Sequence, residues 1–153
     1  MIKNFKEKLK HHFHKVIKTK KSAHSIALGF AIGTFISILP TPGLNIILGL
    51  LVILIYKKVN KFSLFVAIFF WNTLTLAPIH FLSYKIGDLL FGDADVVRYN
   101  ILILNKIYNF TRRYLVGNFI IAVIVSTVSY FIIKKIVDEY RVRIILREGT
   151  RKI

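Results

Sequence analysis

The chain has 153 residues, 55% of them hydrophobic, and 23 Lys and Arg against seven acids give a net charge of +16. This hydrophobicity excludes a disordered chain, and the lack of Cys excludes a disulfide scaffold and a thiolate catalyst. Long apolar runs separated by basic segments are typical of a membrane protein. The sequence predicts an all-α integral membrane protein with about four membrane segments, including proline-broken or re-entrant hairpins.

Residues 1–21 are expected to form a basic amphipathic helix that lies in the membrane interface, because apolar residues recur on one helical face and lysines fill the other. Eight lysines along the chain are expected to contact anionic lipid headgroups: Lys3, Lys6, Lys10, Lys18, Lys57, Lys58, Lys134 and Lys135. A nucleic-acid-binding arm is the alternative for this segment. We expect no nucleic-acid partner, because so apolar a chain already lies at a membrane.

Residues 22–133 form the predicted membrane domain. Its first part, 22–56, carries no charged side chain, is too long for one crossing and contains Pro40-Thr41-Pro42-Gly43. Proline removes a backbone donor, so we expect two helices, 22–39 and 44–56, joined by a turn. The second helix is short for a bilayer, which favours a re-entrant arm.

The turn supplies the first residues of a hypothetical substrate path: Pro40, Pro42, Gly43 and Asn45. Irregular backbone at membrane depth is tolerated only inside protein or beside a water-filled cavity. An ordinary loop at the far membrane face is the alternative interpretation.

Small residues occupy every fourth position of 22–39, at Ser25, Gly29, Gly33 and Ser37. Small residues at this period let helix backbones approach closely in lipid. The stripe predicts either packing within the chain or a homodimer through the same surface.

The next uncharged segment, 62–84, is long enough to span a bilayer. It supplies the remaining candidates for the substrate path: Asn72, Thr73, Thr75, Pro78 and His80. An ionisable residue in an apolar segment marks a functional site by default, and His80 is the one here; a kinked structural helix is the alternative. Two apolar segments, each broken near its middle, also hint at inverted repeats with substrate between them.

Segment 114–133 is the last predicted membrane segment, and 134–153 is predicted to be a basic cytoplasmic tail. Short Lys/Arg-rich segments stay cytoplasmic, so both termini are expected to be cytoplasmic in a multi-pass protein of the cytoplasmic membrane. Residues 99–113 then lie outside, although they are basic. The alternative places a second hairpin at Asn72–Pro78, with 99–113 inside and the tail outside.

Two stretches resemble a known family: "IALGFAIGTFISILPTPGLNIILGLL" and "NTLTLAPIHFLSYKIGDLLFG". Through them, Ala23–Gly92 resembles the prokaryotic domain of unknown function 2062 family, which shares a small-residue helix, a proline turn and an Asn-Pro-Leu-Thr-x-x-Pro stretch. The matching residues are Asn72, Leu74, Thr75, Pro78, Tyr84 and Gly87, and Thr73 stands where the family usually has Pro. The resemblance implies a small integral membrane protein without assigned activity. Some relatives carry glycosyltransferase-like domains, which suggests cell-envelope lipid or polyprenyl-phosphate metabolism.

Two functions are consistent with these features. The first is a carrier or flippase-like transporter for an anionic lipid or polyprenyl phosphate. The alternative is a non-catalytic scaffold that docks a cell-envelope enzyme. No acid pair, Ser-His-Asp signature or phosphate-cradling glycine loop occurs in the sequence, so we expect no catalytic residue, no cofactor and no metal.

Overall fold

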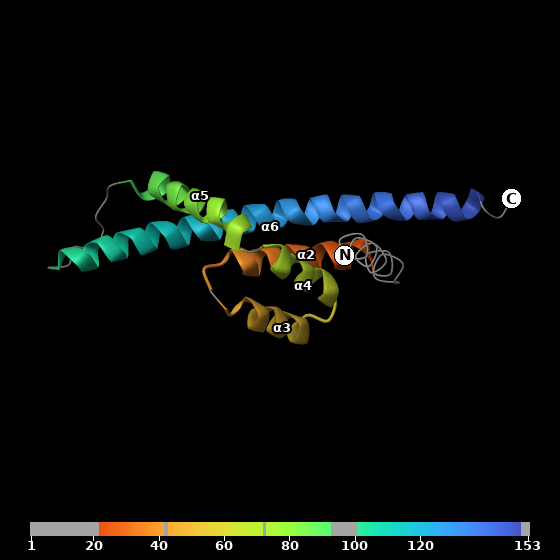
Figure 1. The fold of residues 1–153 in the computed structure, drawn as a ribbon, viewed down its shortest axis with the longest axis horizontal. Coiled ribbons are helices and arrows are strands. Elements are labelled where there is room, and N and C mark those ends of the chain that lie inside the picture. Colours follow the sequence, from red (N-terminus) through yellow and green to blue (C-terminus); the bar gives the residue numbers. More distant parts are fainter. Residues whose placement is uncertain (1–21, 42, 72, 93–100, 151–153) are drawn as a thin grey trace, which may run out of the picture.

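The computed structural model describes residues 22–41, 43–71, 73–92 and 101–150, and every regular element in these ranges is a helix (Figure 1). The helices are α2 (Ala23–Ile38), α3 (Asn45–Ile55), α4 (Lys61–Phe70), α5 (Thr73–Phe91) and α6 (Leu102–Thr150). The all-α class is confirmed for this part of the chain. The interfacial helix predicted over 1–21 lies outside the described residues, and its lysines with it.

Helix α6 is the long axis of the molecule (Figure 1). Its 49 residues extend about 74 Å at about 1.5 Å per residue, more than twice the thickness of a bilayer's hydrocarbon. Among the described residues it is the one helix that is by itself long and apolar enough to cross a membrane. The predicted segment 114–133 is its uncharged middle, and the chain continues from residue 134 to Thr150 as the same helix.

Helix α2 lies along the middle of α6 in the opposite direction (Figure 1). Ala23 packs beside Val137 at one end of the contact, and Ile38 packs against Ile121 at the other. Ser22 begins the helix, because its side chain accepts the Ser25 N–H. The helix ends at Ile38, as expected for a chain that reaches Pro40 two residues later.

Helix α3 returns the chain toward the start of α2, and α4 then packs against α2. The Asn60 N–H donates to the Ser25 carbonyl at 3.1 Å, and the Ser25 hydroxyl donates to the Lys58 carbonyl at 2.5 Å. The basic 57–61 loop therefore lies beside the first turn of α2. A small apolar core, formed by Ile53, Val59, Leu64 and Ile68, holds α3 and α4 together.

The predicted continuous segment 62–84 is divided between two helices. Helix α4 ends at Phe70, α5 begins at Thr73, and the two axes differ by 79°. The bent pair together has the length and composition of a second membrane segment. Pro78 lies inside α5 rather than at the bend, so the break falls before Pro78, at the start of the predicted Asn72–Pro78 stretch.

Large apolar side chains are exposed on α3, α4, α5 and α6. Ile55 is 80% exposed, Leu89 is 85% exposed, and thirty further large hydrophobic residues stand out from the surface. A soluble monomer exposes single apolar residues but rarely such continuous apolar area. About half of the buried residues are Ala, Gly and Ser, and the buried large apolar side chains are Ile, Val and Leu.

Candidate functional site

The small-residue stripe of α2 is covered by α4. A Cβ at Gly29 would lie 2.6 Å from the Asn60 carbonyl oxygen, and one at Gly33 would lie 2.8 Å from the Ala67 Cβ. The Ser63 hydroxyl of α4 donates to the Ile26 carbonyl at 2.7 Å. The stripe therefore packs within the chain. A homodimer through the same surface stays a prediction, and it would require α4 to move away.

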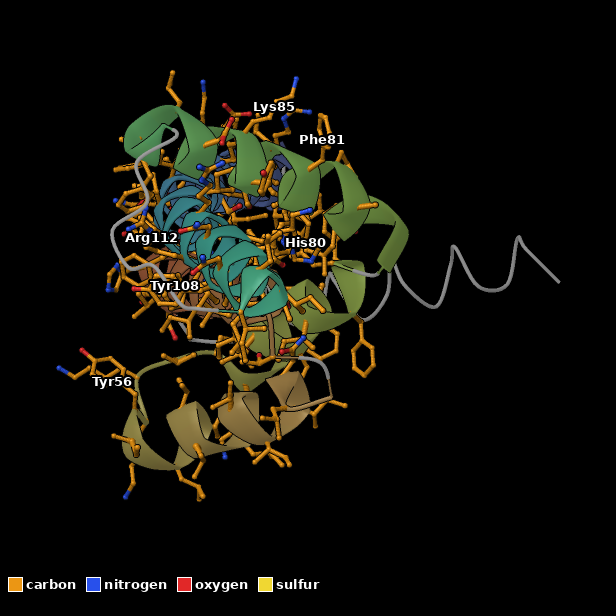
Figure 2. All side chains as sticks on the ribbon, turned by 90° about the vertical axis from the view of Figure 1, so that its left-hand side faces the viewer. Tyr56, His80, Phe81, Lys85, Tyr108 and Arg112 are labelled. Atoms are coloured by element: carbon orange, nitrogen blue, oxygen red, sulfur yellow. The ribbon has the colours of Figure 1, made fainter. Side chains whose placement is uncertain are left out.

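Four polar side chains meet where α5 crosses α6, and we call them the polar junction: His80, Ser83, Tyr114 and Asn118. The Tyr114 hydroxyl lies 2.9 Å from His80 Nδ1, and Asn118 Nδ2 lies 3.4 Å from both His80 Nδ1 and the Ser83 hydroxyl. Figure 2 shows that His80 points from α5 toward α6, whereas Phe81 and Lys85 point outward. The junction therefore joins the two helices through side chains that are costly to place in an apolar segment.

Asn118 connects this junction to the end of α2. It is fully buried, and its Nδ2 donates to the Ile38 carbonyl at 3.0 Å. A helical partner for that carbonyl would come from residue 42, which is proline and has no N–H. The proline turn thus creates an orphan acceptor, and Asn118 satisfies it.

The side-chain amide of Asn118 also carries an oxygen, Oδ1. Its Oδ1 is buried and meets no donor within the described part of the chain. An unpaired buried acceptor costs about 1–3 kcal/mol. A donor group from a ligand would recover this free energy.

Two glycines allow the backbones of α5 and α6 to touch at the junction. A Cβ at Gly87 would overlap the Arg113 carbonyl, and a Cβ at Gly117 would overlap the Ser83 carbonyl. Close approach through glycine is the packing that lipid-embedded helices favour. Beyond the contact, Arg113 pairs with Asp88 at 2.6 Å.

The remaining candidates for the substrate path hold local turns. The Thr41 hydroxyl donates to Asn45 Oδ1 at 2.8 Å, and the Thr75 hydroxyl donates to the Phe70 carbonyl at 3.4 Å. Gly43 has a φ of 80°, a backbone conformation that residues other than glycine rarely adopt. Pro42 and Asn72 lie outside the described residues, as does the side chain of Thr73.

Of the predicted residues, the structure brings His80 to the junction, and Pro40 follows the helix end that Asn118 contacts. Sequence reasoning missed Ser83, Tyr114 and Asn118. Asn118 lies within the uncharged segment 114–133, where a polar side chain is costly, and this signal could have identified it. Tyr114 is one turn earlier on the same helical face. No group of three metal-ligating side chains comes together among the described residues.

The fold defines an all-helical protein, within the described ranges, that has one helix long and apolar enough to cross a membrane. A bacterial family described as "Uncharacterized protein conserved in bacteria (DUF2062)" matches residues 6–144. The chain belongs to this family, which confirms the resemblance inferred from the two motifs. The match extends through most of α6, so the polar junction lies inside the family's region. The comparisons with curated proteins and with solved structures gave no match to the chain.

Proposed function

We propose that this chain is a multi-pass protein of the cytoplasmic membrane that carries an anionic lipid or a polyprenyl phosphate across the bilayer. The polar junction supports the proposal most strongly. It sits among apolar helices, at the point where the turn after α2 meets α5 and α6. The Tyr114 hydroxyl lies 2.9 Å from His80 Nδ1, and in the tautomer that accepts a hydrogen bond there, the Nε2–H is a donor for a phosphate oxygen.

Membrane integration is supported by the length of the α2–α6 contact. It extends along α6 from Ile121 to Val137, about 24 Å at about 1.5 Å per residue, which is most of the hydrocarbon thickness of a bilayer. The exposed apolar residues of α3 to α6 would face acyl chains. Helices shorter than a full crossing fit broken or re-entrant segments packed around α6.

The predicted topology gains support from the positions of the lysines. Lys58 lies beside Ser25 at the start of α2, and that turn packs near Val137 of α6, so Lys134 and Lys135 lie at the same end. The positive-inside rule would place this end in the cytoplasm, where these lysines would contact anionic headgroups. Arg112 and Arg113 then lie at the other end of the 114–133 segment, on the opposite side of the membrane.

Lipid transfer in reconstituted vesicles tests the carrier. Vesicles of phosphatidylcholine with fluorescent phosphatidylglycerol would report leaflet exchange through quenching by dithionite. We expect His80→Phe combined with Asn118→Leu to abolish the exchange that the unmodified protein catalyses. His24→Phe is the matched control, because His24 Nδ1 and the Tyr130 hydroxyl form a second His–Tyr pair between α2 and α6, at 2.7 Å. Equal exchange in all three proteins, or equal loss in both variants, would contradict the proposed site.

A scaffold that docks a cell-envelope enzyme is the second candidate, and the far end of α6 favours it. This end carries Asp138, Glu139, Arg141 and Arg143 and extends past the first residue of α2 (Figure 1). A photo-crosslinking residue at Val142 in living cells should capture one defined protein if the scaffold interpretation is correct. The same residue at Phe131, which faces the proposed lipid, is the control. We expect neither function to require catalysis by this chain.

A further inference from the structure

A groove separate from the polar junction opens between α5 and the first turns of α6. It has a volume of about 530 Å³ and is lined by Tyr84 and by one face of α6 that includes Asn105, Lys106, Asn109, Phe110 and Arg113. The α6 residues recur at intervals of three and four, so they share one helical face. Lys106 and Arg113 are two of the basic residues that the predicted topology leaves outside without a role.

The polar lining of the groove is suited to an anion. Arg113 is held in place, because its guanidinium pairs with Asp88 at 2.6 Å and donates to the Gly92 carbonyl. Lys106 is exposed, so among the described residues that line or contact the groove two cations stand against one carboxylate, that of Asp88. The groove also starts at the first turn of α6, where the helix dipole favours negative charge.

The apolar lining is suited to a hydrocarbon chain beside that anion. Leu102 is 72% exposed in the groove, and Tyr84 and Phe110 stack with ring centroids 5.2 Å apart. The aromatic row continues to the polar junction, because Phe110 stacks on Tyr114 at 6.1 Å and Tyr114 contacts His80 at 5.8 Å. The groove and the junction are thus two ends of one row of rings.

We propose that this groove binds the phosphate headgroup of an amphiphile, with Lys106 and Arg113 on the phosphate and the aromatic row along its apolar part. The inference rests on the proposed carrier function for its direction, since the groove would load the lipid that the polar junction passes on. Binding is nevertheless measurable without transport. A protein that binds here but moves no lipid would refute only the carrier, and one that transports without binding here would refute only this groove.

Chemical labelling of lysines in the full-length chain tests the groove. The purified protein in a neutral detergent would be acetylated with and without dihexanoyl phosphatidic acid, and each lysine followed by mass spectrometry. We expect Lys106 to be protected and Lys85 to react unchanged, because Lys85 lies over the Phe81 ring on the outer face of α5 (Figure 2). Equal protection of both lysines would overturn the proposal. So would equal protection by dihexanoyl phosphatidylcholine, or by inorganic phosphate at the same concentration.

Affinity measurements on variants give a second test. We expect Lys106→Gln to weaken binding of dihexanoyl phosphatidic acid about tenfold, because it removes a charge-assisted hydrogen bond. Lys85→Gln removes the same charge from the neighbouring helix and should leave affinity unchanged. Lys106→Arg should bind like the unmodified protein, which excludes misfolding as the cause. An unchanged affinity in Lys106→Gln, or an equal loss in Lys85→Gln, would contradict the assignment.

Discussion

The α2–α4 contact and the α5–α6 contact both bring two helix backbones close together, but different polar side chains form the hydrogen bonds in each. Both depend on two glycines that bring backbones together, Gly29 and Gly33 in the first and Gly87 and Gly117 in the second. The first contact also contains a serine hydroxyl that donates to a carbonyl, from Ser63 to Ile26, and the Trp71 indole N–H, which donates to the Thr34 hydroxyl at 2.9 Å. The second adds a histidine, a tyrosine and an asparagine that bond to one another, and an ion pair at its edge.

This difference separates a structural contact from a candidate site. Serine-to-carbonyl bonds are complete within the chain and leave little for a ligand to gain. The α5–α6 contact instead concentrates side chains that can donate, accept or change protonation, and one acceptor of Asn118 is unpaired within the described residues. Polar groups that exceed what packing needs are the ones expected to serve function.

The largest expected effect comes from the glycines of the α5–α6 contact. Gly117→Ala should destabilise the protein by about 3 kcal/mol or more, because its Cβ would overlap a main-chain carbonyl in the middle of α5, which cannot move locally. Gly29→Ala should cost less, since its Cβ would lie 2.6 Å from the Asn60 carbonyl oxygen, whereas the Gly117 Cβ would overlap the Ser83 carbonyl outright. Thermal unfolding in detergent measures both, and Ala77→Leu on the exposed face of α5 is the control. A greater loss for Gly29→Ala would reverse the order of the two contacts.

Much of the fold could be read from the sequence, because its signals are local. The predicted 22–39 and 44–56 agree with α2 and α3 within about two residues, since Pro40 and Gly43 end one helix and turn the chain by their own geometry. The full length of α6 was not predicted. Hydropathy detects only its apolar middle, although no Pro or Gly interrupts residues 118–148.

The candidate site was only partly predictable, because its residues come from separate helices. His80 was visible as an ionisable residue in an apolar segment. Tyr114 and Asn118, the α6 residues that contact His80 and Ile38, could not be predicted. A sequence shows that a carbonyl loses its helical donor, but it does not show which side chain replaces that donor. Gly87 is the one glycine of α5, and Gly117 lies 32 residues from Gly149, the other glycine of α6, so they form no periodic stripe like that of α2.

The hydrogen bonds of the two contacts should differ by a smaller amount than the glycines. Asn118→Leu should cost about 1–3 kcal/mol, because the Ile38 carbonyl would be left buried without a donor. Ser63→Ala should cost only about 0.6 kcal/mol, since the Ile26 carbonyl lies inside α2 and keeps its helical partner. Unfolding of both variants in the same detergent gives the comparison. Equal costs would mean that the Ile38 carbonyl, which lacks a helical donor because of Pro42, depends on its side-chain partner no more than the Ile26 carbonyl does.

The smallest expected effect on stability comes from the ion pair at the edge of the α5–α6 contact. Asp88→Asn should cost at most about 1 kcal/mol, because the Asp88 side chain is 49% exposed and its pair with Arg113 is screened by water and salt. Ser25→Ala, which removes the hydroxyl bond to Lys58 at the opposite end of the molecule, is a stability control of comparable size.

Asp88→Asn should also strengthen the binding of dihexanoyl phosphatidic acid severalfold, because it removes the carboxylate that competes with phosphate for the Arg113 guanidinium. Titration of the unmodified protein and of Asp88→Asn with this lipid at low salt measures the two affinities, and the gain in affinity should fall as salt is added. A large loss of stability with no gain in affinity would mean that Arg113 serves the α5–α6 contact alone. A gain in affinity at little cost would mean that an anion can take the place of Asp88 on the Arg113 guanidinium, and this property separates the α5–α6 contact from the α2–α4 contact.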